Sequence, residues 1–317
     1  MTEDHSARSQ GADHATDNAS TSKENGDRAG VYDIKLHTSP VSPIANRPTR
    51  LLLVVTKLAA HDPIREFDLV HDRLMHLTVV SEDLAFFDHV HPELGNGVFR
   101  LAYRFPEAGP YRLWADAKPK GGGRTLVAFR LEIEGGPIHR PLALVPDRER
   151  TKVVMDGQYR VTLAPRGEVA AEKPVVLTFS LARADGSPVR DLEPLMAAGG
   201  HCVVIRQDAQ TFLHVHPTRE VDPSWRGGPD VAFETTFPTP GLYKVWGQFL
   251  HAGLVSQPPS CSTWFDVNSH TALRLMRSAF VTTVTLEAAM KSAPHSGRRT
   301  IPTGTPTPAA RGNATAL

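Results

Sequence analysis

The chain contains an internal repeat, and this repeat limits the fold more than any other feature of the sequence. The segment MHLTVVSEDLAFFDHVHP (residues 75–92) aligns without gaps with GHCVVIRQDAQTFLHVHP (residues 200–217), at an offset of 125 residues. A second pair, VFRLAYRFPEAGPYRLWADAKP (98–119) and VAFETTFPTPGLYKVWGQFLH (231–251), aligns at an offset of 132 from Phe99 and Val231 onward. Self-similarity of this kind marks a folding unit that occurs more than once. We therefore expect two copies of one domain, at residues 31–137 and 156–268.

Each copy is expected to be a β-sandwich. In the first copy, alternating or apolar runs are separated by clusters of Pro, Gly, Asp and Asn, a pattern that predicts short strands. The runs cover residues 32–38, 50–56, 76–80, 86–91, 98–105, 111–117 and 125–133. About seven strands in about 100 residues favour an immunoglobulin-like or cupredoxin-like sandwich. The expected fold class is all-β, with two such sandwiches in tandem, and Tyr111, Trp114, Tyr243 and Trp246 are expected to be core or corner aromatics.

The segments outside the two copies have the composition of tails and a linker. Residues 1–30 contain almost no large apolar side chains and cannot offset the entropy of ordering, so we expect a disordered tail. Residues 138–155 are expected to be a linker, and 269–317 a short helix followed by a disordered basic tail. The first segment lacks the apolar run of a signal peptide, which predicts a cytoplasmic protein. No stretch is long enough to predict a membrane span.

Composition excludes several classes of function. The formal net charge is +1, with 35 Lys and Arg against 34 Asp and Glu, so no general attraction to nucleic acid is expected. Two cysteines cannot form a disulfide framework or a four-thiolate zinc site. Histidine is the unusual component, with 15 residues. The positions of these histidines are therefore the main guide to function.

Three histidines recur at equivalent positions in the two copies. They are His76, His89 and His91 in the first copy and His201, His214 and His216 in the second. Residues i and i+2 of a strand point to the same face, so each HVH motif presents two imidazoles together. If each hairpin turns at the centre of its SEDL or RQDA segment, His76 lies opposite His89 and His201 opposite His214. Cross-strand partners are close enough for three imidazoles to converge, which predicts one three-histidine metal site in each copy.

Candidate fourth ligands differ between the copies. Asp116 lies near the end of YRLWAD in the first copy, His251 near the end of YKVWGQFLH in the second, and His71 could approach the first site. Imidazole suits copper, zinc, nickel and iron, whereas calcium and magnesium prefer oxygen. Three histidines with an open position fit a catalytic zinc site as well as a copper site. The alternative is a structural histidine cluster, in which the imidazoles bond buried polar groups.

Two parts of the chain carry a resemblance to a known family. They are VHDRLMHLTVVSEDLAFFDHVHP with FPEAGPYRLWAD, and DGSPVRDLEPLMAAGGHCVVIRQDAQTFLHVHP with FPTPGLYKVW. Together they resemble a bacterial family of duplicated, usually exported β-sandwich proteins with HVHP motifs, similar to YtkA-like and cupredoxin-like domains. The resemblance implies copper handling and, in contrast to the missing signal peptide, a location outside the cytoplasm.

Two functions from different classes are compatible with these features. The first is a non-catalytic module that binds a metal, copper or alternatively zinc, and buffers it or passes it to a protein partner. The second is an immunoglobulin-like interaction or scaffold protein with structural histidines. A metallo-hydrolase or oxidase is a weaker third, because the sequence has no G-x-S-x-G, P-loop or H-E-x-x-H motif.

Overall fold

The computed structural model describes residues 31–59, 62–136, 144–155, 157–215, 217–256 and 262–268. All regular structure in these residues is β, which confirms the predicted fold class. The predicted tails at 1–30 and 269–317 lie outside the described residues, as does His216. A search of the same residues for a helix with the length and hydropathy needed to cross a bilayer finds none.

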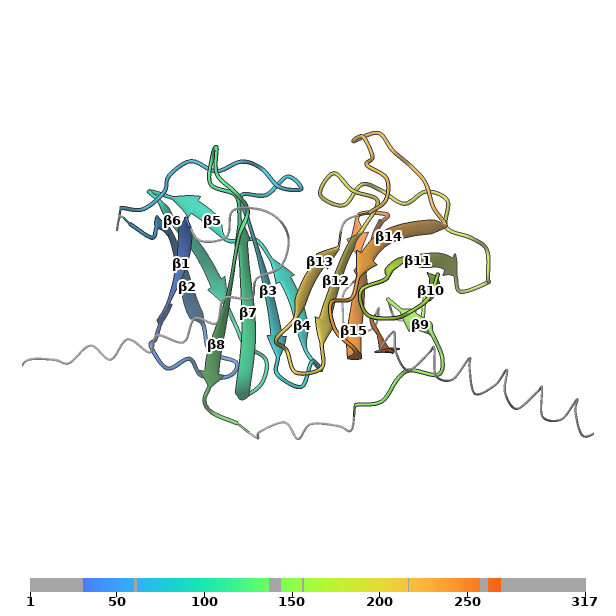
Figure 1. Cartoon of the computed structure of the whole chain (residues 1–317), viewed down its shortest axis with the longest axis horizontal. Helices are drawn as coiled ribbons and strands as arrows, with labels where there is room; N and C mark the ends of the chain where they lie inside the picture. Colours follow the sequence, from blue (N-terminus) through green and yellow to red (C-terminus); the bar gives the residue numbers. More distant parts are fainter. Residues whose placement is uncertain are drawn as a thin grey trace, which may run out of the picture. The chain divides into compact units, whose positions relative to one another are not determined.

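The first copy is a sandwich of two antiparallel sheets (Figure 1). One sheet has the order β1 (Tyr32–Ser39), β2 (Thr49–Lys57), β6 (Val98–Tyr103), β5 (Glu93–Gly95). The other has the order β4 (Phe87–Val90), β3 (Met75–Ser81), β7 (Gly109–Ala117), β8 (Thr125–Ile133). All seven strands predicted from the sequence are present, and the short β5 is the one addition.

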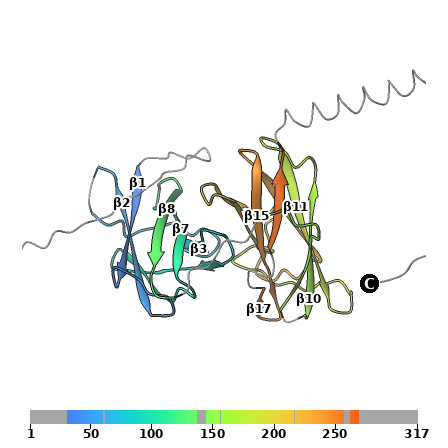
Figure 2. The same cartoon turned by 90° about the horizontal axis from the view of Figure 1, so that it is seen from below.

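The second copy repeats this arrangement, and Figure 2 shows β10 and β11 in a layer beside β15. One sheet has the order β14 (Asp230–Thr236), β11 (Pro174–Arg183), β10 (Tyr159–Arg166), β9 (Thr151–Val154). The other has the order β13 (Phe212–Val215), β12 (His201–Arg206), β15 (Gly241–Gln248), β18 (Ser262–Val267), and β16 (Leu250–His251) pairs with β17 (Leu254–Val255). Strand β9 lies inside the predicted linker 138–155, because its backbone pairs with β10 at the edge of the sheet.

Alternation along the strands builds a separate core in each sandwich. In β3, Met75, Leu77 and Val79 point into the core of the first copy. Tyr111 and Tyr243 are corner residues, as expected: their hydroxyls donate to the carbonyls of Glu107 at 3.2 Å and Thr239 at 2.9 Å. The burial of β3 does not alternate, however, since six of its seven residues are buried. A strand that is buried on both faces needs a second layer of protein on its outer face.

That second layer is the other copy. A third cluster of buried residues combines side chains from both repeats: Val80, Leu84, Phe87, Trp114, Ala128, Val203, Ile205, Ala209, Phe212 and Trp246. Phe87 stacks on Trp246 with ring centres 4.8 Å apart, and Phe212 stacks on Trp114 at 5.0 Å. In each stack, the phenylalanine of one repeat contacts the tryptophan of the other. The two repeats therefore pack together through equivalent surfaces. The two tryptophans therefore lie between the sandwiches instead of inside one core.

The histidine hairpins have a different register from the predicted one. The structure pairs Thr78 with His89 and Val203 with His214, so His89 does not lie directly opposite His76, nor His214 opposite His201. Each register is displaced by two residues. A displacement by two keeps every side chain on its predicted face. Continuation of the observed register beyond Leu77 and Val90 puts His91, and not His89, opposite His76.

The turn explains the displacement in the first hairpin. Four residues separate Ser81 from Phe86, and the Ser81 amide donates to the Phe86 carbonyl at 3.3 Å. Asp83 Oδ1 accepts from the Ala85 amide at 3.0 Å, an Asx turn, and Leu84 has a φ of 57°. The prediction assumed a two-residue turn and was wrong, because the Asp side chain and the left-handed Leu84 lengthen the loop.

The packing between the repeats predicts that substitutions at the interface lower the free energy of unfolding. Replacing Trp246 by Ala removes a fully buried indole, so the free energy of unfolding should fall by about 3 to 5 kcal/mol. A double-mutant cycle with Phe87→Ala should show a coupling of about 0.5 to 1.5 kcal/mol for the stacked pair. Urea denaturation measures both quantities. The exposed Val153→Ala is the control, and a loss below about 1 kcal/mol for Trp246→Ala would contradict a packed interface.

Candidate metal centre

Three histidines of the first repeat lie on the face that packs against the second. His76 is in β3 and pairs with Asp116 of β7. His89 is in β4, and His91 follows the end of that strand. His76 and His89 are buried, with 2% and 9% of their surface exposed, and His91 is half-buried. The hairpin thus places three imidazoles in an interior where each needs polar partners.

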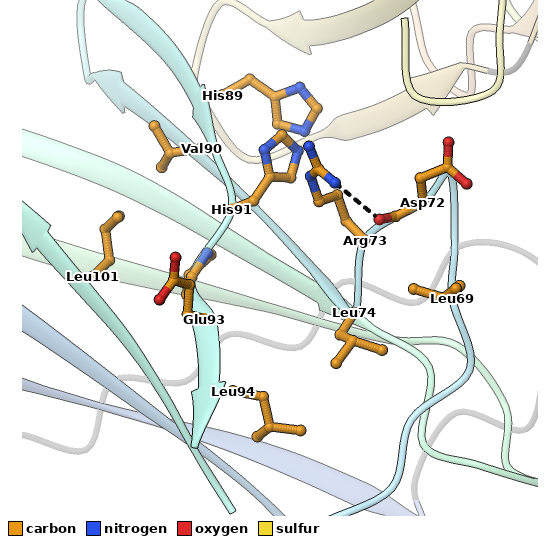
Figure 3. Close-up of a pocket in the computed structure, with 11 residues that line it drawn as sticks. Leu69, Asp72, Arg73, Leu74, His89, Val90, His91, Glu93, Leu94 and Leu101 are labelled. Carbon is orange, nitrogen blue, oxygen red and sulfur yellow. Dashed lines mark hydrogen bonds between the residues drawn. The ribbon is translucent and has the colours of Figure 1, made fainter. Parts of the chain in front are cut away.

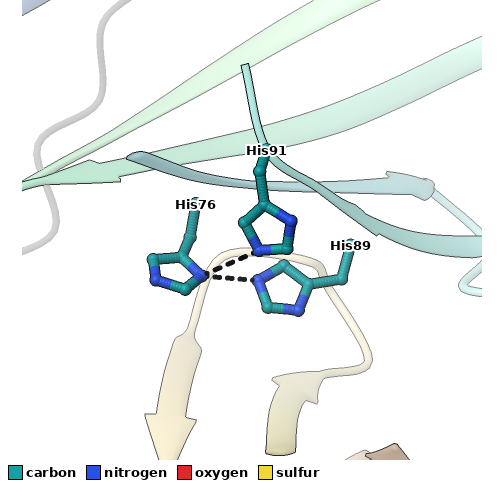
Figure 4. Close-up of side chains that lie close together, drawn as sticks. All are labelled: His76, His89 and His91. Atoms are coloured by element: carbon teal, nitrogen blue, oxygen red, sulfur yellow. Dashed lines mark hydrogen bonds between the residues drawn. The ribbon is translucent and has the colours of Figure 1, made fainter. Parts of the chain in front are cut away.

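The ring nitrogens of this triad point toward one another (Figure 4). His76 Nδ1 lies 3.0 Å from His89 Nε2 and 3.2 Å from His91 Nε2. The three ligand atoms are all within 4.8 Å of one another. Imidazole nitrogens that share one tetrahedral ion at 2.0 to 2.1 Å are about 3.3 Å apart. The geometry of the triad is therefore close to that of a three-nitrogen metal site.

The hydrogen bonds made by the outer ring nitrogens determine the tautomers of His76 and His89. His76 Nε2 donates to the Val70 carbonyl at 2.8 Å, and His89 Nδ1 donates to Gln248 Oε1 at 3.0 Å. Both oxygens can only accept a hydrogen bond. In the neutral rings the inner nitrogens, His76 Nδ1 and His89 Nε2, therefore both carry lone pairs. Two lone pairs that face each other at 3.0 Å cannot bond to each other, and a cation between them would satisfy both.

The surroundings keep these imidazoles neutral. Burial lowers the pKa of His76 to about 4 and that of His91 to about 3. Burial also lowers the pKa of His89 well below its ordinary value, and the neighbouring histidines add to the effect. Neutral imidazole is the form that binds metal ions. Near pH 7 the triad is thus ready to bind without first losing a proton.

Two histidines of the second repeat, His201 and His214, lie beside this triad. The ring centre of His201 is 5.7 Å from that of His89, and the ring centre of His214 is 5.4 Å from that of His76. His71, at a φ of 46°, comes within 5.2 Å of His201. Histidines from both repeats thus lie in one cluster, while the predicted three-histidine site of the second copy stays a prediction. His216 lies outside the described residues.

Asp116 lies in the cluster but is engaged by other groups. Arg124 Nε donates to its carboxylate at 2.8 Å, and His214 Nδ1 lies 3.2 Å from its Oδ2. Burial alone would raise the pKa of Asp116, but its hydrogen bonds to Arg124 and His214 hold the pKa below its ordinary value. The carboxylate therefore stabilises its neighbours and is not one of the three converging ligands.

The structure places His251 in a different set of contacts. Its Nδ1 lies 2.6 Å from the Tyr159 hydroxyl, and its Nε2 lies 3.1 Å from Asp191 Oδ1. None of its contacts among the described residues joins it to the triad. The predicted fourth ligand of the second copy is thus bonded to its own repeat.

Sequence reasoning missed the groups that orient the triad. Gln248 of the second repeat supports His89 of the first, and Arg124 holds Asp116. One signal was available, because Gln248 occupies the repeat position equivalent to Asp116. Each of the two contacts a histidine of the other copy: Gln248 contacts His89, and Asp116 contacts His214. This reciprocity depends on the packing of the repeats, which no local pattern encodes.

A cavity of about 750 Å³ reaches the triad from the first repeat. His89 and His91 form part of its wall, and Figure 3 shows the Arg73 side chain beside the His91 ring. The rest of the wall is lined by Leu69, Asp72, Leu74, Val90, Pro92, Glu93, Leu94 and Leu101. The two histidines are therefore accessible to an ion or a small ligand.

The solved structures to which this chain is similar include parts of bacterial proteins. An alpha-2-macroglobulin from Escherichia coli is 10% identical, with a TM-score of 0.25, over 77% of this chain and 16% of that chain. A Salmonella alpha-2-macroglobulin is 12% identical, with a TM-score of 0.24, over 75% of this chain and 15% of that one. The chain thus spans about a sixth of these proteins. The Escherichia coli adhesin FdeC is 12% identical, with a TM-score of 0.24, over 77% of this chain and 66% of that chain.

No curated protein matches the chain. A family profile described as a domain of unknown function, DUF8832, matches twice, at residues 27–135 and 151–263. The two matches coincide with the two sandwiches and together cover more than half of the sequence. The chain therefore belongs to the DUF8832 family and contains two copies of its domain.

Proposed function

We propose that the protein binds copper through His76, His89 and His91, and that it buffers the ion or passes it to a protein partner. The observation that carries this proposal is the pair of inner nitrogens, His76 Nδ1 and His89 Nε2, which face each other at 3.0 Å. Their outer nitrogens both donate to oxygen acceptors. A bound cation would accept both inner lone pairs, and the outer hydrogen bonds would stay unchanged.

The donor set favours copper over other ions. The triad offers three neutral nitrogens, and calcium and magnesium prefer oxygen ligands. Among divalent first-row metals, nitrogen sites bind Cu²⁺ most tightly, ahead of Zn²⁺. The resemblance to cupredoxin-like proteins points to the same metal. Zinc is the alternative, since imidazole also suits it.

Binding and transfer fit the surroundings better than catalysis. The cavity at His89 and His91 gives the ion a path to and from the triad. Asp116, the carboxylate in the cluster, is paired with Arg124 and has a lowered pKa, so it is a weak base. A hydrolytic centre would need a stronger base near a metal-bound water. The competing function, an interaction protein with structural histidines, predicts that the histidines affect stability without any metal dependence.

Metal binding by the triad is tested with a single substitution. The wild-type protein should take up one equivalent of Cu(II) in isothermal titration calorimetry. His91→Ala removes a half-buried ligand, so the affinity should fall by at least about 100-fold. The matched control is His37→Ala, an exposed histidine on β1 of the same repeat, which should leave the affinity unchanged.

The opposite result would support structural histidines. If the wild-type protein takes up neither copper nor zinc, and His91→Ala only lowers the melting temperature, the triad is part of the packing and not a metal site. Equal affinity of wild type and His91→Ala would place any bound metal elsewhere in the chain.

Burial also predicts how the affinity responds to pH. Because the pKa of His76 is lowered to about 4 and that of His91 to about 3, protons do not compete for these nitrogens above about pH 5. A competition titration should give nearly the same copper affinity at pH 7.5 and pH 5.5. A site of exposed histidines, with a pKa of about 6.5, would lose about tenfold per histidine for each pH unit below that value. A loss of that size between pH 6.5 and pH 5.5 would contradict a buried, neutral triad.

A further inference from the structure

The equivalent of His76 in the second repeat has a buried nitrogen with no partner in the part of the chain that the structure describes. His201 begins β12, and its backbone pairs with Gln248 just as His76 pairs with Asp116. It is buried, with 3% of its surface exposed. Its Nε2 is fully buried and has no hydrogen-bond partner among the described residues. A buried, unsatisfied polar atom is costly and indicates that a water or an ion belongs beside it.

The His201 ring lies next to the triad, with one ring-centre distance inside the range expected for two ligands of one ion and one slightly beyond it. Two imidazoles on one ion have ring centres about 5 to 6 Å apart, because each nitrogen lies about 2 Å from the metal and about 1 Å from its ring centre. The rings of the triad are 4.8 to 5.1 Å apart. The His201 ring is 5.7 Å from His89 and 6.1 Å from His76.

Two other polar groups of the cluster, Asp116 and His214, contact Arg124 and each other. Asp116 is held by Arg124 in an ion pair, and His214 Nδ1 lies 2.7 Å from Arg124 Nη2 and 3.2 Å from the Asp116 carboxylate. Unlike these two residues, His201 is buried and has a ring nitrogen with no hydrogen-bond partner among the described residues. Three protein nitrogens also leave one position open in a four-coordinate ion.

We propose that His201 is the fourth nitrogen ligand of the ion held by His76, His89 and His91, so that the metal joins the two repeats. This inference rests on the proposed function, since it assigns a further ligand to the same ion. It makes the centre a shared one: three ligands come from the first repeat and one from the second. Metal binding then adds to the hydrophobic packing that holds the two sandwiches together, because the ion is bound tightly only when both are in place.

The test uses the full chain with one equivalent of Cu(II). Pulsed electron paramagnetic resonance counts the imidazoles on the copper, and competition with a chelator gives the affinity. The wild-type protein should show four coupled imidazoles. His201→Ala should show three, with an affinity at least about tenfold lower. His201→Gln preserves most of the side-chain volume and serves if His201→Ala does not fold, as judged by circular dichroism and thermal melting without metal.

The control and the outcomes separate the two proposals. His251→Ala changes a histidine of the second repeat that is bonded to Tyr159 and Asp191, and it should leave the imidazole count and the affinity unchanged. If the wild type binds copper and both His201 variants keep its imidazole count and affinity, the shared centre is overturned and the triad site stands. If the wild type binds no metal, the proposed function itself is overturned.

Discussion

The packing of β3, β4 and β7 against β12, β13 and β15 is the interaction on which the arrangement of the histidines depends. On each of these strands, the face that packs against the other repeat is apolar at one end and polar at the other. In β3 it runs from Val80 to His76, and in β4 from Phe87 to His89. The apolar ends form the hydrophobic cluster between the repeats, which excludes water. The same contact therefore buries the polar ends and brings the histidines of both copies together.

Burial gives these histidines properties that exposed ones do not have. It keeps the rings neutral by disfavouring the charged form, as the lowered pKa values of His76 and His91 show. It also makes unsatisfied nitrogens costly, so each ring needs a defined partner. Val70 and Gln248 supply partners for the outer nitrogens and orient the inner ones toward the centre of the triad. Partners of this kind are what fix metal-binding histidines in a single tautomer.

The sequence was sufficient to predict the sandwiches, because strand periodicity and turn residues act over a few positions. It also identified His76, His89 and His91, since duplication made the HVH motif stand out and the period of two put both imidazoles on one face. The predicted hairpin register was wrong because the register depends on the turn conformation of Asp83 and Leu84, which the strand pattern does not specify. The contact of Gln248 with His89 could not be predicted, because 159 residues separate the two and only the packing of the repeats joins them.

Diffraction from copper-loaded crystals tests most directly whether the converging nitrogens of the triad hold a metal ion. Anomalous scattering at the copper absorption edge locates the ion independently of the protein coordinates. A peak is expected about 2.0 to 2.2 Å from His76 Nδ1, His89 Nε2 and His91 Nε2. Copper bound only at exposed histidines, with no peak between these three nitrogens, would contradict metal binding by the triad.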